Sequence, residues 1–140
     1  MSLTITRLTN ADREFYPVMG PFLANRDVVK FVGDKIWDDP GKTWFVAREG
    51  SDVVGFVAVT ELKKRTLAES LYLADADRTD AAAALVAQAV REFGHDRHLE
   101  VTVKRENAPA YTGNGFAEIG PVGKHFLKLA RAATVTRGTR

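Results

Sequence analysis

Two apolar runs near the middle of the chain constrain its fold more than any other feature. They cover residues 44–47 and 53–59, and a short polar segment at residues 49–51 separates them. Polar turn residues, among them Gly50, between two such runs predict a β-hairpin. Because neither run alternates polar with apolar residues, both faces of each strand are expected to be buried. The sequence therefore predicts a sheet that is covered on both sides, and Gly55 within it predicts a bulge or a close backbone approach.

Shorter patterns predict the remaining elements. Strands are expected over residues 3–8, 66–73, 99–104 and 125–130, with a further strand beginning at 116. Helical periodicity predicts helices over residues 13–23, 25–37 and 79–93, and one helical turn within 107–114. The long helix lies between two strands and predicts one parallel crossover, whereas the consecutive hairpins predict antiparallel pairing. The expected class is α/β (α+β), a mixed, mostly antiparallel sheet flanked by helices on both faces.

Length and composition limit the domain count and the kinds of site. The 140 residues, 45% of them hydrophobic and 27% charged, predict one globular domain over residues 1–131. Residues 132–140 are expected to form a flexible basic C-terminal tail. The chain has no cysteine, which excludes disulfides, thiolate metal sites and a cysteine nucleophile. The three histidines show no metal-ligand spacing, so no metal site is expected. Without a recognisable signal segment or membrane span, the expected location is cytoplasmic.

Three strings, in the order in which they occur, carry a resemblance to a known family. Residues 44–47 followed by 53–55 resemble the second and third strands of the GCN5-related N-acetyltransferase (GNAT) superfamily. Residues 71–78 resemble its strand that leads into the acyl-CoA pyrophosphate loop, and residues 107–116 resemble its C-terminal motif. The resemblance covers roughly residues 3–130. It implies the GNAT-like acyl-CoA N-acyltransferase fold, with acetyl-CoA or another acyl-CoA as cofactor.

The resemblance implies a pyrophosphate site at the start of the helix expected over 79–93. A strand that splays from its neighbour leaves backbone N–H groups unpaired, and a helix N-terminus carries about half a positive charge, so the two together favour an anion. Arg78 and Ala83 match the family's loop pattern, whereas Ala81 stands where the family has glycine. The implied cofactor-binding residues are Leu71, Leu73, Arg78, Thr79, Asp80, Ala81, Ala82, Ala83 and Asn107. The alternative interpretations are that Thr79 and Asp80 cap a core helix and that Asn107 is an ordinary N-cap.

Tyr111 and Glu69 are the predicted catalytic residues. Tyr111 precedes Gly115 by four residues, as does the tyrosine that protonates the departing thiolate in the family. A phenol suits this step because its reference pKa of about 10 lies near the value of about 8.5 for a thiol. Glu69, on a strand where the family often has a glutamate, is interpreted as the general base and is expected to share a strand face with Leu71 and Leu73. The alternatives are an aromatic residue packed on the sheet and a solvent-facing acid.

Trp37, Asp38 and Asp39 are predicted to bind the acceptor. They lie between the second helix and the second strand, where the family forms its acceptor pocket. Two carboxylates and an indole hold a cationic amine by charge and cation–π contact. The alternative is an ordinary turn in the segment Asp-Asp-Pro-Gly.

The leading functional prediction is an acyl-CoA-dependent N-acyltransferase that moves an acyl group to a primary amine of a small molecule or a protein. A GNAT-fold enzyme with a nucleic-acid or other polyanionic acceptor is the second possibility, because Lys63, Lys64, Arg65 and the C-terminal stretch are basic. The third is a non-catalytic binding module that has lost CoA binding, which Asp80 and Ala81 suggest. The resemblance also implies a homodimer, since family members often dimerise.

Overall fold

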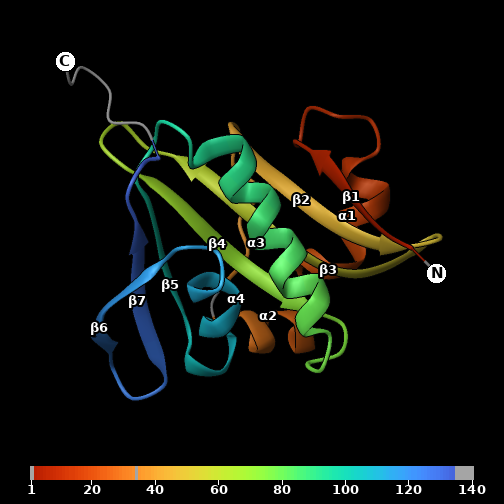
Figure 1. Cartoon of the computed structure of the whole chain (residues 1–140). Coiled ribbons are helices and arrows are strands. Elements are labelled where there is room, and N and C mark those ends of the chain that lie inside the picture. The colour runs from red at the N-terminus through yellow and green to blue at the C-terminus, as the bar shows by residue number, and fades with distance from the viewer. Residues whose placement is uncertain (1, 34, 135–140) are drawn as a thin grey trace.

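The structure is a computed structural model that describes residues 2–33 and 35–134. The described residues form a sheet of seven strands in the order β1-β2-β3-β4-β5-β7-β6 (Figure 1). The strands are β1 (Leu3–Leu8), β2 (Lys42–Glu49), β3 (Asp52–Glu61), β4 (Thr66–Leu73), β5 (Leu99–Lys104), β6 (Ala117–Val122) and β7 (Phe126–Arg131). Neighbouring strands pair antiparallel except β4 and β5, which pair parallel. The predicted fold class, with its one parallel crossover, is confirmed.

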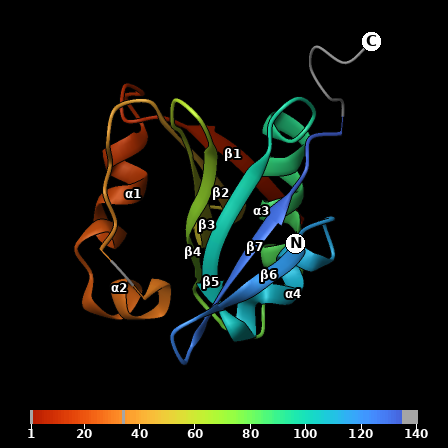
Figure 2. The same ribbon diagram turned by 90° about the vertical axis from the view of Figure 1, so that its left-hand side faces the viewer.

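Helices cover both faces of this sheet, as Figure 2 shows in an edge-on view. On one face lie α1 (Phe15–Leu23) and α2 (Arg26–Val32); on the other lie α3 (Thr79–Phe93) and α4 (Ala108–Thr112), which follows the 3₁₀ turn η1 (Arg105–Asn107). Each face has its own apolar core. Leu85 and Leu129 belong to the core beneath α3, and Phe15 and Trp44 belong to the core beneath α1. The double coverage explains why β2 and β3 are apolar on both faces.

The two N-terminal helices are shorter than the sequence predicts. The Asp12 carboxylate accepts a hydrogen bond from the Thr9 N–H at 2.7 Å, in a turn that delays the start of α1 to Phe15. Asn25 caps α2 by accepting from the N–H groups of residues 27 and 28. That helix ends at Val32 because Gly33 adopts a φ of 91°, a left-handed conformation that terminates helices. Residues 35–39 therefore form an irregular segment. Trp37 lies in this segment and not in the helix that the sequence predicted.

A bulge in β4 decides which side chains face which side of the sheet. Phe56 of β3 pairs with Tyr72, and Ala58 pairs with Glu69, so three steps along β4 match two along β3. Ser70, with a φ of 60°, lies in this bulge. Leu71 and Leu73 consequently point into the core beneath α3, whereas Glu69 lines a cavity on the opposite face. The prediction that Glu69 shares a face with these two leucines is wrong, because a bulge breaks the alternation of a strand.

The parallel pair β4–β5 opens along its length. The two strands are in register at Thr66–Leu99 and Leu67–Glu100, and β5 then continues in register with β7 alone. Within the described residues, the edge of β4 beyond Leu67 has no strand partner on that side. The chain leaves β4 at Leu73 and enters α3 at Thr79, so the open edge leads toward the start of that helix (Figure 1). The splayed strand that the pyrophosphate-site argument requires is present.

Candidate functional site

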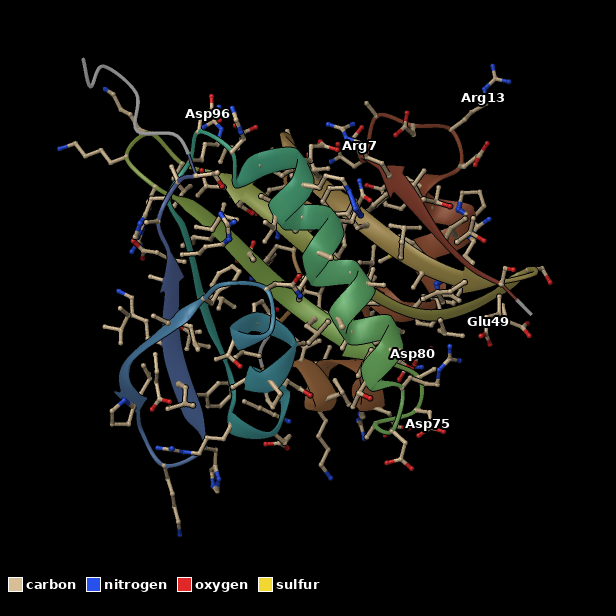
Figure 3. All side chains as sticks on the ribbon, in the orientation of Figure 1. Arg7, Arg13, Glu49, Asp75, Asp80 and Asp96 are labelled. Carbon is tan, nitrogen blue, oxygen red and sulfur yellow. The ribbon has the colours of Figure 1, made fainter. Side chains whose placement is uncertain are left out.

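Arg78 dominates the start of α3. Its Nη1 and Nη2 atoms donate to the two carboxylate oxygens of Glu49 at 3.0 and 2.9 Å. Its Nε and Nη2 atoms donate to the two carboxylate oxygens of Asp80 at 2.9 and 3.0 Å. Figure 3 shows Glu49 and Asp80 on the same side of the molecule, beside the first turn of α3. The guanidinium group is therefore engaged by two acids of the chain itself.

The Asp80 carboxylate lies close to the exposed N-terminus of α3. The Arg78 guanidinium, together with the backbone N–H groups of Ala81 and Asp80, lowers the pKa of Asp80 to about 2. Thr79, Asp80 and Ala83 are exposed, whereas Ala81 and Ala82 are buried in the core beneath the helix. The methyl group of Ala81 thus packs away from the exposed terminus. The N-cap position belongs to Arg78, so the interpretation of Thr79 or Asp80 as the capping residue is wrong.

Tyr111 of α4 is fully buried on the α3 side of the sheet. Its ring packs edge-on against Phe116, with ring centroids 5.3 Å apart. Within residues 2–33 and 35–134 its hydroxyl has no hydrogen-bond partner, and burial raises the pKa of the phenol well above its usual range. A buried polar atom without a partner costs about 1–3 kcal/mol. The phenol is thus a proton donor that lacks an acceptor.

Asn107 and the two β4 leucines are the remaining residues that the resemblance assigns to the cofactor site. Asn107 occupies the N-cap position of α4, but its side chain makes no capping hydrogen bond. The ordinary-cap interpretation of Asn107 is therefore not what the structure shows. The side chains of Leu71 and Leu73 are buried in the core, so only their backbone groups can meet a molecule in the β4–β5 opening.

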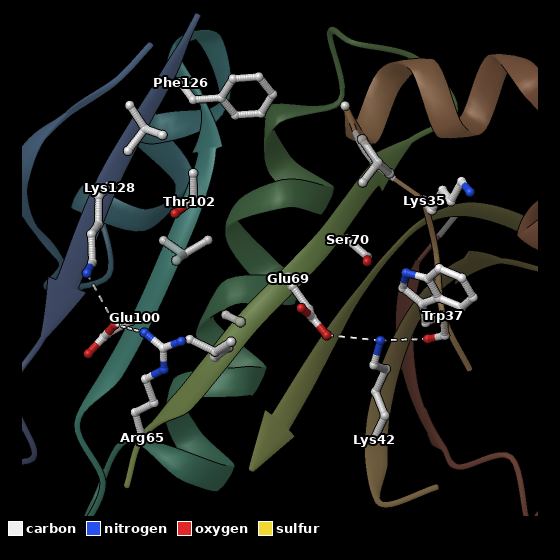
Figure 4. Close-up of a pocket in the computed structure, with 16 residues that line it drawn as sticks. Lys35, Trp37, Lys42, Arg65, Glu69, Ser70, Glu100, Thr102, Phe126 and Lys128 are labelled. Carbon is white, nitrogen blue, oxygen red and sulfur yellow. Dashed lines mark hydrogen bonds and ion pairs between the residues drawn. The ribbon is translucent and has the colours of Figure 1, made fainter. Parts of the chain in front are cut away.

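A cavity of about 470 Å³ lies on the other face of the sheet, bounded by residues 32, 33, 35 and 37, by β4 and β5, and by the β6–β7 hairpin (Figure 4). Glu69 stands in its wall. Lys42, only 3% exposed, donates from Nζ to the Glu69 Oε1 at 2.9 Å and to the Trp37 carbonyl oxygen at 2.6 Å. The Thr60 hydroxyl donates to the same Oε1 at 2.7 Å. Glu69 is therefore fixed in place, and neither contact uses its Oε2.

The opposite wall of the cavity carries a second charged cluster. Glu100 Oε1 lies 3.6 Å from Arg65 Nη1 and 3.5 Å from Lys128 Nζ, and its Oε2 lies 3.5 Å from His98 Nε2. Figure 4 shows this cluster across the cavity from Glu69 and Lys42. The cavity thus has an acid on each wall, and each acid has basic neighbours.

Comparison with known proteins identifies the fold. No protein-family model matches the sequence, and no curated protein sequence matches it. Solved structures do match. The ribosomal-protein-S18-alanine N-acetyltransferase from Escherichia coli superposes with a TM-score of 0.66 at 15% identity, over 99% of each chain. The PaiA N-acetyltransferase from Thermoplasma acidophilum, in complex with coenzyme A, has a TM-score of 0.63 at 14% identity, over 94% of this chain and 99% of that one.

A third match is the aminoglycoside acetyltransferase AAC(6')-Ib in complex with coenzyme A. Its TM-score is 0.64 at 13% identity, over 94% of this chain and 95% of that one. The chain has the GNAT fold. The fold that the sequence resemblance implies is therefore confirmed over nearly the whole chain, while identities this low say nothing of the substrate.

Within this GNAT fold, the three residues predicted to bind the acceptor do not lie in one site. Trp37 is 58% exposed and lines the cavity. Asp38 does not line it; its carboxylate accepts from the Tyr16 hydroxyl, which raises the pKa of Tyr16, and its carbonyl oxygen accepts from Asn10 Nδ2. Asp39 is exposed, and its carbonyl oxygen accepts from the Lys42 N–H in a turn. The structure thus brings Trp37 alone to the cavity, and the two carboxylates belong to other contacts.

Sequence reasoning missed Lys42 and the Glu100 cluster. The available signal for Lys42 was a lysine directly before the fully apolar run of β2, where a charge needs a partner. Glu100 and Lys128 come together through the β5–β7 pairing, which sequence spacing does not reveal. Lys63 and Lys64 are exposed, and Arg131 donates to the carbonyl oxygens of residues 94 and 114. The two arginines of the predicted basic tail, Arg137 and Arg140, lie outside the described residues.

Two kinds of feature are absent from residues 2–33 and 35–134. No group of three or more acidic or histidine side chains is arranged to hold a metal ion. No helix in this part of the chain combines the length and the apolar character that a membrane crossing requires.

Proposed function

We propose that this chain is an acyl-CoA-dependent N-acyltransferase that moves the acyl group of acetyl-CoA to a primary amine by direct attack. The divergence of β4 from β5 after Leu67, beside the start of α3, carries the proposal. The edge of β4 that faces β5 is left without a strand partner after Leu67. This edge and the N-terminus of α3 together border one opening. Two proteins of the same fold, named as acetyltransferases, are in complex with coenzyme A, which supports this assignment.

The residues of the opening suit the parts of an acyl-CoA. The pantetheine arm contains amide groups, and the unpaired backbone of β4 between Ala68 and Leu73 offers N–H and C=O partners to them. Asn107 adds a side-chain amide, which makes no capping hydrogen bond to α4. The N-terminus of α3 favours a pyrophosphate, and Arg78 would contact it after giving up Asp80 or Glu49.

The bound acyl-CoA supplies a thioester carbonyl carbon that accepts the amine. Glu69, held by Lys42 and Thr60, would take the proton that the amine loses. Tyr111, whose hydroxyl has no acceptor within the described residues, would give its proton to the departing sulfur. The two groups lie on opposite faces of the sheet, so the amine would approach the thioester carbon from the face of Glu69, and the sulfur would leave toward the face of Tyr111 as the C–S bond breaks.

Two measurements on the purified protein test this function. In the first, acetyl-CoA and desulfo-CoA are expected to raise the melting temperature, because both contain the pyrophosphate and the pantetheine arm. In the second, thiol release from acetyl-CoA is expected to depend on an added amine. No thermal shift with either compound, together with no amine-dependent thiol release, would contradict the proposal.

One observation favours a second candidate, a binding module without CoA. Arg78 is already held by two carboxylates, and the Asp80 carboxylate lies at the helix terminus that a phosphate would need. If this arrangement is permanent, the natural chain will not bind acetyl-CoA. Binding by the natural chain would eliminate this candidate.

A further inference from the structure

The cavity that contains Glu69 carries an excess of positive charge. Four of its lining side chains are cationic, namely Lys35, Lys42, Arg65 and Lys128, whereas two, Glu69 and Glu100, are anionic. The remaining lining residues are neutral, and several, such as Phe126, are apolar. The formal charges of the described lining side chains therefore sum to +2.

The cations of the two walls are engaged to different extents. Lys42 is almost fully buried and bonded to Glu69 at 2.9 Å, so it neutralises that acid. Arg65 and Lys128 are 52% and 42% exposed and lie 3.6 and 3.5 Å from Glu100. A tight charge-assisted bond measures about 2.7–2.9 Å. Arg65 and Lys128 thus share one acid at longer range and keep donors that can point into the cavity.

A neighbouring cavity extends this charge. It measures about 460 Å³ and shares Lys35 and Trp37 with the first. Arg26 and Lys30 also line it, and the described residues that line it include no acid. Cationic lining residues therefore continue beyond Trp37 into this second cavity.

We propose that the acceptor is a small molecule that carries a carboxylate as well as its primary amine, as an amino acid does. The inference rests on the proposed function. The carboxylate would lie against Arg65 and Lys128, and the amine would lie toward Glu69 on the facing wall (Figure 4). The cavity volume of about 470 Å³ falls in the range of roughly 300–1,000 Å³ of small-molecule sites. A polyamine would meet repulsion from the surplus charge.

The first test compares acceptors that differ in charge. Thiol release from acetyl-CoA is measured with the twenty common amino acids, with their carboxamides, and with putrescine and spermidine. At least one amino acid is expected to react with a kcat/KM about tenfold or more above that of its own carboxamide, the factor expected for one lost bond to a charged group. The two polyamines are expected to be poorer acceptors than that amino acid.

The second test removes the two exposed cations. Arg65→Met and Lys128→Met are each expected to raise the KM of the best amino acid about tenfold, and to change the KM of its carboxamide less than about twofold. Glu100→Gln is expected to lower the KM of the amino acid, since it removes a competing carboxylate. Lys63→Met is the matched control, because Lys63 is an exposed cation near Arg65 that does not line the cavity. This control is expected to change neither KM.

The melting temperature with acetyl-CoA separates the two proposals. If acetyl-CoA raises it but polyamines or carboxamides react as well as the acids, or no amino acid reacts, the carboxylate inference is overturned and the proposed function survives. Equal KM changes for acid and carboxamide in Arg65→Met and Lys128→Met would overturn it as well. If acetyl-CoA does not bind, the proposed function fails and this inference fails with it.

Discussion

At the start of α3, Arg78 is held by Glu49 and Asp80 through four bonds of 2.9–3.0 Å. Across the sheet, Arg65 and Lys128 share Glu100 at 3.6 and 3.5 Å. At α3 one cation, Arg78, is paired with two carboxylates. In the cavity two cations, Arg65 and Lys128, share the single carboxylate of Glu100. An anion that binds beside α3 must displace a partner held at 2.9–3.0 Å, whereas one that binds in the cavity competes only with the longer contacts of Glu100. Competition with internal carboxylates is therefore expected to limit anion affinity more at α3 than in the cavity.

The largest expected effect is at Tyr111, on the α3 side. Tyr111→Phe removes the proposed general acid, so turnover is expected to fall by about 10²–10⁴-fold, the usual contribution of a positioned proton donor. The free energy of unfolding is expected to stay equal or to rise by up to about 1–3 kcal/mol, because a buried hydroxyl without a partner disappears. Steady-state kinetics and denaturant titration measure the two effects.

Tyr16→Phe serves as the control, because Tyr16 is an exposed tyrosine on the other face of the sheet. It is expected to leave turnover unchanged. Equal turnover in the natural chain and Tyr111→Phe would remove Tyr111 from the mechanism.

The next largest effect is a loss of stability at Gly55, where the backbones of β3 and β4 approach closely on the α3 side of the sheet. A Cβ at Gly55 would lie 2.6 Å from the Tyr72 carbonyl oxygen, closer than such atoms can approach. Gly55→Ala is expected to reduce the free energy of unfolding by about 1–3 kcal/mol, as overpacking of a core does. Gly120→Ala is the matched control, because a Cβ at Gly120 would meet no heavy atom within 4 Å beyond its chain neighbours. Equal stability of the two variants in a urea titration would show that β3 and β4 can move apart at Gly55.

A smaller effect is expected where the α3 terminus and Asp80 compete for an anion. Asp80→Asn keeps the side-chain shape but removes its charge, which releases Arg78 from one of its two acids. Acetyl-CoA is expected to bind about two- to fivefold more tightly, because one negative charge at the helix terminus is removed. Asp52→Asn, an exposed acid at the start of β3, should change the affinity little. Weaker binding to Asp80→Asn would mean that Asp80 supports the donor site.

The smallest effect is a dependence of stability on pH. The pKa of Asp80 is lowered to about 2, so its ion pair adds stability that is fully present above the ordinary pKa of about 3.8. That stability is lost as the pH falls toward 2. The melting temperature of the natural chain should therefore fall more than that of Asp80→Asn between pH 4 and pH 2. A constant difference between the two over this range would show that the Arg78–Asp80 pair adds no stability.

The sequence predicted much of the fold because apolar spacing governs it. The bounds of β4, α3 and β5 agree with the predicted ranges 66–73, 79–93 and 99–104, where strand alternation or a helical stripe is clear. The end of α2 was predicted too late, at residue 37, because the apolar pattern continues to Ile36 while Gly33 turns the backbone away. Periodicity shows which residues can be buried, and it does not show where a single left-handed residue stops a helix.

The candidate site was less predictable, for a different physical reason. Ser70 in a left-handed conformation moves Glu69 to the face opposite Leu71, and no residue pattern marks a bulge formed by serine. The cations around Glu100 come from β4, β5 and β7 or their flanking turns, so tertiary pairing alone assembles them. Arg78 was identified from the resemblance, but its bonds to Glu49 join residues that are distant in the sequence. The roles of the predicted site residues stay predictions.

The most direct test of the account is a calorimetric titration of the natural chain with acetyl-CoA, with desulfo-CoA as a second ligand. The account predicts one site per chain with micromolar affinity for both, because the opening between β4 and β5 and the start of α3 would hold the parts that the two ligands share. Heat of binding that is absent for both ligands at millimolar concentration would contradict it. The Arg78 pairs with Glu49 and Asp80 would then close the site, and the GNAT fold of this chain would serve another purpose.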